Sequence, residues 1–189
     1  LIALPHVASP TMPHAPQGAT RAVIVSHSAA AALCGHPRNV PDDVLAAIGA
    51  QNGVVMVAFV PSFLTEARRA WVANGEVGEP PPVGVAEVAD HIEHIRDVAG
   101  VHAVGLGGDY DGTDAMPEGL EDVSGYPVLF NELARRGWTD DELLGLASEN
   151  ALRVLAASDA QYLAFLSGEA DPPSGIAIAP AIDTTADRS

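Results

Sequence analysis

The sequence predicts an α/β fold with a parallel sheet, because short apolar segments alternate with helical patterns along the chain. Each apolar segment lacks a polar face, which is typical of a strand buried on both sides of a sheet. A loop with polar or glycine residues follows each segment. The four segments are residues 1–4, 22–25, 54–60 and 103–106.

Helical patterns occupy the stretches between these strands. The first expected helix opens at residues 41–43, where two aspartates suit the positive end of a helix dipole. The second is expected over residues 83–99, with apolar side chains on one face. The apolar positions of the two helices are Val44, Leu45 and Ile48, and Val85, Val88, Ile92 and Ile95.

The last third of the chain predicts two more helices. Thr139 is a good N-cap, and Glu142 three residues later completes a capping box. A final helix is expected over residues 151–157. From about residue 167 the composition turns to Pro, Gly, Ala, Asp and Thr, which predicts a mostly disordered tail.

The number of strand–helix units indicates half of a larger architecture. A complete (β/α)8 barrel needs about 250 residues, whereas this chain has 189 residues and four predicted strands. We therefore expect a half barrel, which leaves two strand edges and one sheet face uncovered. The first residues read as the inside of a strand, so we expect the chain to be part of a larger protein.

Composition excludes several classes of function. The formal net charge is −16, and all nine basic residues are arginine. Without lysine there is no Schiff base, no pyridoxal phosphate anchor and no P-loop lysine. Strong acidity without a basic run argues against nucleic acid and anionic membranes as partners.

The sequence also bears on compartment. No apolar run is long enough to span a bilayer. A single cysteine, Cys34, cannot form an internal disulfide, which favours a reducing compartment such as the cytoplasm. The compartment of the full protein stays open.

Three of the four predicted strands end in a group that could do chemistry, namely His6, His27 and Asp109. The carboxyl ends of parallel strands surround a common opening, where α/β proteins place their sites. Two imidazoles there can reach one metal ion, and an aspartate can ligate metal or accept a proton. The alternative is that each is an ordinary polar residue at a strand end.

Arg38 and the pair of His91 and His94 are further candidate functional residues. Arg38 follows His27 by eleven residues and would suit a carboxylate or an oxyanion; alternatively it pairs with Asp42 or Asp43. His91 and His94 are three residues apart, whereas the helical metalloprotease pattern needs two histidines four apart. That pair is therefore interpreted as part of a polar helix face.

The motifs around these residues, taken together, resemble the membrane (renal) dipeptidase family. They occur in the order and spacing of that family, and the resemblance covers about residues 1–157, with residues 158–189 as a C-terminal extension. The motifs occupy residues 26–28, 34–43, 88–95, 105–112, 117–124, 126–127 and 150–154.

The resemblance implies the C-terminal half of a zinc dipeptidase on a (β/α)8 barrel of the metal-dependent hydrolase type. It implies two Zn²⁺ ions per complete site, with His6 and His27 binding the second. Arg38 would hold the substrate carboxylate or the tetrahedral intermediate. Asp109 would contact the substrate and accept the proton of the attacking water. The family usually has Asp where this chain has Ala3, a departure that bears on His6.

The implied function is zinc-dependent hydrolysis of dipeptides by metal-activated water, as part of a larger enzyme. One alternative is the same site acting on D-residue dipeptides or β-lactams. Another is a catalytically inactive fragment or degenerate family member. Residues 61–82 are expected to form part of the pocket wall. The open sheet edges also leave room for self-association, and a homodimer of the full-length protein is a further expectation.

Overall fold

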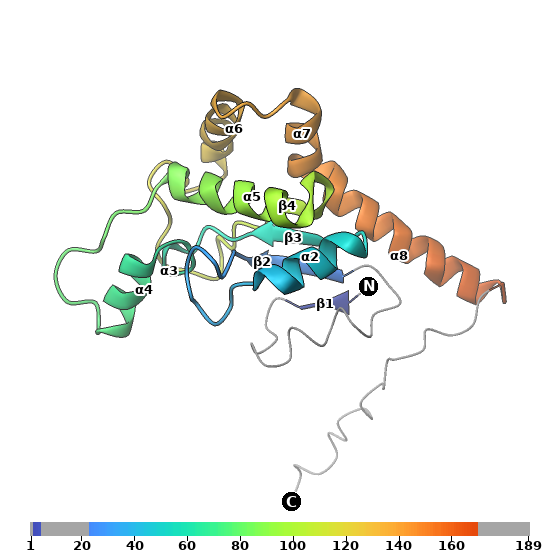
Figure 1. Ribbon diagram of the computed structural model, residues 1–189, viewed down its shortest axis with the longest axis horizontal. Coiled ribbons are helices and arrows are strands. Elements are labelled where there is room, and N and C mark those ends of the chain that lie inside the picture. Colours follow the sequence, from blue (N-terminus) through green and yellow to red (C-terminus); the bar gives the residue numbers. More distant parts are fainter. Residues whose placement is uncertain (1, 5–22, 170–189) are drawn as a thin grey trace, which may run out of the picture.

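A four-stranded parallel sheet forms the centre of the computed structural model, which describes residues 2–4 and 23–169 (Figure 1). The strands are β1 (Ile2–Ala3), β2 (Val23–Ser28), β3 (Val54–Val57) and β4 (Val104–Leu106). They lie in the order β1-β2-β3-β4, and every neighbouring pair is parallel. The predicted α/β fold with a parallel sheet is therefore confirmed, while the half barrel stays a prediction.

Seven α-helices surround this sheet in the described part of the chain. In Figure 1, α4 and α8 project beyond the sheet at opposite ends of the molecule. Among the described residues, we find no helix with both the length and the apolar character that a bilayer crossing requires. The helices are α2 (Asp42–Ala50), α3 (Pro61–Leu64), α4 (Glu66–Ala73), α5 (Val85–Ala99), α6 (Tyr126–Arg135), α7 (Asp140–Leu144) and α8 (Asn150–Leu166). Two 3₁₀ turns, η1 (Val101–Ala103) and η2 (Val123–Gly125), and one π-helical segment, η3 (Gly145–Glu149), complete the helical elements of the described part.

The hydrophobic core lies where α2 and α5 pack against the sheet and against each other. Both helices bury the faces that their apolar spacing predicts. Thr139 caps α7 as expected, because its side chain accepts from the backbone N–H of Glu142. The buried residues on these faces include Val44, Leu45 and Ile48 on α2 and Val88, Ile92 and Ile95 on α5.

Four helices differ from the sequence-based expectation. Residues 61–82 contain α3 and α4, and Thr65 is the N-cap of α4, because its hydroxyl accepts from the backbone N–H of Arg68 at 3.1 Å. Helix α6 was not predicted. The last helix continues past residue 157 to Leu166, because alanine, leucine and glutamine in that stretch favour helix. Of the expected tail, residues 170–189 lie outside the described part.

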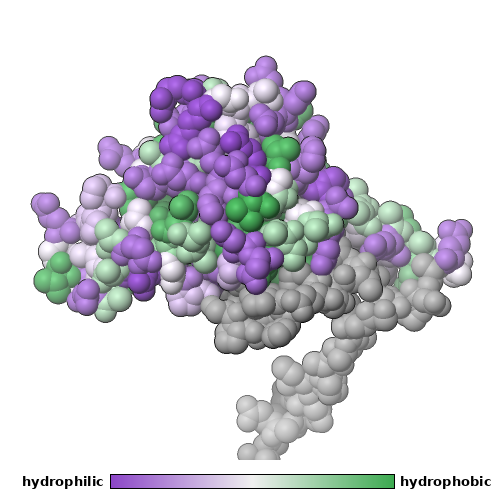
Figure 2. Space-filling view, viewed as in Figure 1, coloured by the Kyte–Doolittle hydropathy of each residue, from purple (hydrophilic) through white to green (hydrophobic). Residues whose placement is uncertain are grey.

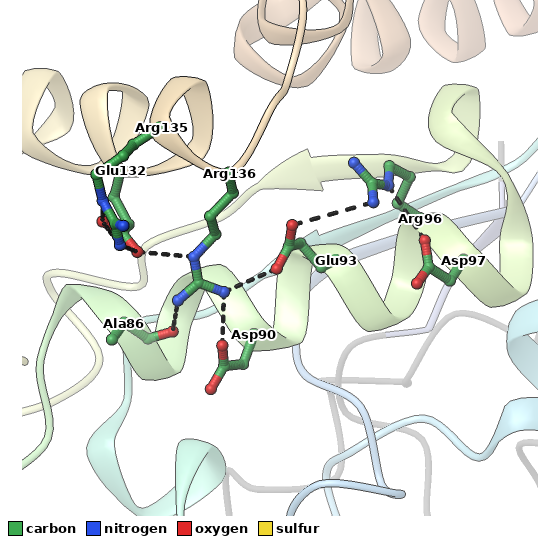
Figure 3. A network of polar contacts seen from close by, with 8 residues as sticks. All are labelled: Ala86, Asp90, Glu93, Arg96, Asp97, Glu132, Arg135 and Arg136. Carbon is green, nitrogen blue, oxygen red and sulfur yellow. Dashed lines mark hydrogen bonds and ion pairs between the residues drawn. The ribbon is translucent and has the colours of Figure 1, made fainter.

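A single arginine fixes α6 on α5 (Figure 3). Arg136, at the end of α6, donates to Asp90 at 2.6 Å, to Glu93 at 2.7 Å and to Glu132 at 2.7 Å. It also donates to the carbonyl oxygen of Ala86 at 3.2 Å. One guanidinium thus satisfies three carboxylates from two helices. Figure 2 shows that hydrophilic residues cover most of this upper part of the molecule.

Candidate functional site

Two of the predicted site residues lie at the carboxyl edge of the sheet. His27 is the second-last residue of β2, and Asp109 follows the end of β4 by three residues. The register places the ends of β2, β3 and β4 side by side, since Ser28 pairs with Val57 and Val57 with Leu106. The sequence placed His27 just beyond its strand, whereas it lies inside β2. The other predicted ligand, His6, lies outside the described residues.

The backbone brings these two segments into contact across the end of β3. Gly107 has no side chain, and a Cβ at that position would overlap the backbone oxygen of Ser26. Past β3, the N–H of Ala58 donates to the Ser28 carbonyl at 2.7 Å, and the N–H of Phe59 donates to the Gly108 carbonyl at 3.1 Å. The residue before His27 therefore touches a residue two before Asp109.

The surroundings of His27 fit a metal-binding imidazole. The hydroxyl oxygen of Ser26 lies 2.9 Å from Nδ1 of His27. A hydrogen bond on one ring nitrogen is what orients the other nitrogen toward a metal ion. Among the described residues, however, no three His, Cys, Asp or Glu side chains converge to hold an ion. Of the two predicted ligands, His27 alone lies in the described part of the chain.

Asp109 sits on a strained turn. Its φ is 63°, in the left-handed region that residues with a Cβ rarely adopt. The N–H of Gly112 donates to the Asp109 carbonyl at 3.0 Å and closes the turn. A Cβ on Gly112 would overlap the Asp109 carboxylate, so a larger residue there would force that side chain to move. Strain of this kind clusters at functional sites, where the surrounding structure holds it.

An aromatic cluster anchors the turn that carries Asp109. The ring of Tyr110 lies 5.9 Å from that of Phe59 and 6.3 Å from that of Tyr126. Its hydroxyl donates to the carbonyl oxygen of Asp122 at 3.1 Å. Burial, with smaller contributions from Tyr126 and Asp122, raises the pKa of Tyr110 to about 12. Tyr110 therefore stays a neutral donor and acts as an anchor.

Arg38 is held by its backbone and by an aromatic ring. Its carbonyl oxygen accepts from the buried Ser28 hydroxyl at 2.6 Å, directly next to His27. Its guanidinium carbon lies 5.5 Å from the ring centre of Phe63 on α3, where a cation–π contact is favourable. Of the two alternative partners of Arg38, Asp42 instead contacts His94 at 2.8 Å.

The loop that carries Arg38 is closed by a buried amide. Asn39 donates through Nδ2 to the carbonyl oxygens of Cys34 at 2.8 Å and of Phe63 at 2.7 Å. His36 stacks on the ring of Phe63 at 4.2 Å, and burial followed by the charge of Arg38 lowers its pKa. Burial likewise raises the pKa of the Cys34 thiol, which makes a reactive thiolate unfavourable.

A cavity of about 510 Å³ lies beside this edge. Its walls come from the start of α3, from α4 and from residues 112–115, just after Asp109. The expectation that residues 61–82 line a pocket agrees with this arrangement. The principal wall residues are Val60, Ser62, Arg68, Trp71, Thr113 and Asp114.

One prediction on this part of the chain was wrong. His91 was assigned to a polar helix face, yet it is 1% exposed and lies within the core face of α5. The spacing could have revealed this, because His91 follows Val88 by three residues and precedes Ile95 by four. His94 does lie on the partly exposed side, paired with Asp42.

Comparison with known proteins agrees with this arrangement. Residues 1–164 match the family described as membrane dipeptidase, peptidase family M19. The chain belongs to the membrane dipeptidase family. The match extends past residue 157, in keeping with the length of α8.

Solved structures of this family share the fold. A metallopeptidase from Rhodobacter sphaeroides, liganded with a phosphinate mimic of the dipeptide L-Ala-D-Ala, is 28% identical with a TM-score of 0.71, over 83% of this chain and 42% of that one. The dipeptidase AC, a metallopeptidase of family M19, is 28% identical with a TM-score of 0.72, over 84% and 42%.

A third structure, the probable dipeptidase PvdM from Pseudomonas aeruginosa, is 20% identical and shows the fold alone, with a TM-score of 0.71 over 83% of this chain and 50% of that one. The chain thus spans about half the length, or less, of these three solved structures. Membership of the family implies a metal cofactor.

Proposed function

We propose that this chain carries the C-terminal half of a (β/α)8 barrel that hydrolyses dipeptides with the help of zinc. The observation that carries the proposal is the family match over residues 1–164, combined with the meeting of the His27 and Asp109 segments at one sheet edge. The parallel order of the four strands supports the barrel. The second half would come from the part of the relatives that this chain does not span.

Each site residue has a proposed role. His27, together with His6, would hold the second zinc ion. The chemistry that zinc supplies when bound is Lewis acidity toward the peptide carbonyl and toward water. Arg38 would bind the free carboxylate of the dipeptide through paired hydrogen bonds. Asp109 would accept a proton from the attacking water and return it to the leaving amine.

The substrate class that we favour is a dipeptide with a D residue at its carboxyl end. The Rhodobacter sphaeroides relative was solved with a mimic of L-Ala-D-Ala. The cavity lined by α3, α4 and the residues just after Asp109 has room for a substrate side chain. β-Lactams are the second substrate class that a panel should contain.

The first test measures carboxylate recognition by the chain as it stands. Isothermal titration with Gly-D-Ala should show binding that is lost with the amide Gly-D-Ala-NH₂ and in Arg38→Gln. Arg135→Gln is the matched control, because Arg135 is an exposed arginine far along the chain on α6. Equal binding of the acid and the amide would contradict the role of Arg38.

The second test measures turnover. We expect no hydrolysis of Gly-D-Ala by these 189 residues alone, because the described part holds a single expected ligand. A longer polypeptide that adds the half present in the relatives should hydrolyse it when loaded with Zn²⁺. In that polypeptide, Asp109→Asn should lower kcat by about 10² or more. Turnover by the 189 residues would overturn the half-site proposal and favour a complete site here.

A further inference from the structure

A buried histidine joins the two segments that hold Arg38. His91 lies in the middle of α5 and is 1% exposed. Its Nδ1 accepts from the backbone N–H of Ala30 at 3.0 Å, and its Nε2 lies 3.0 Å from the carbonyl oxygen of Leu64. Ala30 is two residues past the end of β2, and Leu64 is the last residue of α3.

The two partners fix the protonation state of this imidazole. A backbone N–H can only donate, so Nδ1 must present its lone pair to Ala30. A carbonyl oxygen can only accept, so Nε2 must carry the proton that bonds Leu64. His91 is therefore neutral with its proton on Nε2. A proton added on Nδ1 would face the N–H of Ala30 and abolish that hydrogen bond.

Both partners lead directly to Arg38. Ala30 forms a parallel bridge with Val40, with the N–H of Ala31 donating to the Val40 carbonyl at 2.9 Å and the N–H of Val40 donating to the Ala29 carbonyl at 2.8 Å. Leu64 adjoins Phe63, whose ring contacts the Arg38 guanidinium. One imidazole thus ties the backbone of the Arg38 loop and the ring under its guanidinium to the same helix.

We propose that His91 is a positioning residue for Arg38. In its neutral Nε2–H form, His91 holds α3 against the β2–α2 loop, residues 29–41, and protonation of His91 releases this loop. The inference rests on the proposed role of Arg38 in binding a carboxylate. It adds a pH dependence to that role, because carboxylate binding would weaken as His91 gains a proton.

The charged groups around His91 act in opposite directions. A pocket of about 230 Å³ lies next to the ring, and its charged lining residues are Glu87 and Asp90 on α5 and Glu66 on α4. The β2–α2 loop contributes Leu33, an uncharged residue, to this lining. Burial lowers the pKa of His91, and His94 lowers it further, whereas the Leu64 hydrogen bond and Asp90 raise it. We therefore expect protonation below the ordinary histidine value of 6.5.

The wild-type chain provides the primary test, without any substitution. Nitrogen-15 NMR of the imidazole should show the Nε2–H tautomer at pH 8. On acidification, the hydrogen-exchange protection of the Ala30 and Val40 amides should fall with the same midpoint as the His91 ring signals. The Arg38 Nε signal should shift with that midpoint. A proton on Nδ1 at pH 8, or an Arg38 signal that ignores the His91 titration, would overturn the proposal.

Two substitutions separate positioning from general stability. His91→Asn keeps an acceptor near Ala30 but does not titrate, so its Ala30 protection should persist through the pH range where wild type loses it. His91→Leu keeps apolar volume without an acceptor, and its Ala30 amide should exchange about tenfold faster at pH 8, as loss of one ordinary hydrogen bond predicts. His94→Gln is the matched control and should retain the wild-type transition. Unchanged Ala30 protection in His91→Leu would contradict the proposal.

These readouts follow the Arg38 loop itself. The NMR and exchange measurements therefore test the role of His91, whereas the dipeptide titration tests carboxylate binding by Arg38. Either proposal can be contradicted while the other is supported.

Discussion

The hydroxyl of Ser28 donates a 2.6 Å hydrogen bond to the carbonyl oxygen of Arg38, and Ser28 is fully buried. This contact joins the residue after His27 to the residue proposed to bind the substrate carboxylate. We expect Ser28→Ala to destabilise the fold by about 1–2 kcal/mol, because the partly buried Arg38 carbonyl loses its partner. Urea unfolding measures this change.

The matched control for that substitution is Ser167→Ala. Ser167 also donates to a carbonyl oxygen, that of Ala164 at 3.0 Å, but it lies exposed at the end of α8. Its removal should alter the free energy of unfolding by less than about 0.5 kcal/mol. Equal changes in the free energy of unfolding would show that the buried Ser28 hydrogen bond contributes no more than the exposed one of Ser167.

A second prediction concerns the buried amide of Asn150. Its Nδ2 donates to the carbonyl oxygens of Val101 and Val104, each at 2.8 Å, and so ties the start of α8 to the start of β4. Asn150→Ala should cost about 2–4 kcal/mol, since one buried and one partly buried carbonyl lose their donor. Asn131→Ala, at an exposed site on α6, should cost almost nothing. Thermal or urea unfolding distinguishes the two.

A third prediction tests the clamp in Figure 3. Arg136 is 19% exposed and binds three carboxylates, whereas its neighbour Arg135 is 73% exposed and binds Glu132 alone among the described ion pairs. Arg136→Ala should destabilise the protein by about 1–3 kcal/mol, and Arg135→Ala by less than about 0.5 kcal/mol. Denaturation of both variants in low and high salt checks this. A larger loss in the Arg135 variant would disprove the assignment of the clamp.

A fourth prediction concerns stability in acid. The hydrogen bonds from Arg136, and then from Arg135, hold the pKa of Glu132 below the ordinary glutamate value of 4.5. A lowered folded-state pKa means that this stabilisation is fully present above pH 4.5 and is lost as the pH falls through the lower value. Urea unfolding of wild type and Glu132→Gln between pH 7 and pH 3 should therefore converge at the acid end. A difference that stays constant with pH would refute this.

A fifth prediction tests the contact between the His27 and Asp109 segments. In Gly107→Ala the added methyl group would overlap the backbone oxygen of Ser26, which belongs to β2. We expect a loss of about 3 kcal/mol or more, or failure to fold. Gly84→Ala is the control, because a Cβ there meets its nearest atom, the oxygen of Glu118, at an ordinary 3.5 Å. Soluble yield and unfolding midpoint provide the comparison.

Local patterns were sufficient for much of the fold. The strands, α2, α5 and α7 follow from apolar runs, apolar stripes and the Thr139 cap, all of which act within a few residues. The short helix α3 was missed because Pro61 was taken as a stop, although proline also begins helices. His91 was missed because its spacing to His94 was tested for a metal motif and not for its phase on the core face of α5.

Some features of the candidate site also follow from local sequence patterns, and others depend on contacts between distant segments. The placement of His27 and Asp109 follows from the rule that parallel strands end at one edge, which requires no side-chain detail. The support of Arg38 does not, because it depends on contacts with Ser28 and Phe63 that only the folded chain brings together. The position of the Asp109 carboxylate likewise depends on the space beside Gly112.

The start of α8 has a consequence for how the protein is made. Arg153 donates to the carbonyl oxygens of Asn52 and His102, at 2.6 Å and 2.7 Å, and Asn150 donates to those of Val101 and Val104. These carbonyls lie at the amino ends of β3 and β4, which the ribosome releases long before α8. During synthesis, this end of the sheet stays uncovered until α8 has been made. If translation stalls before residue 150, the end is exposed to solvent and to other chains.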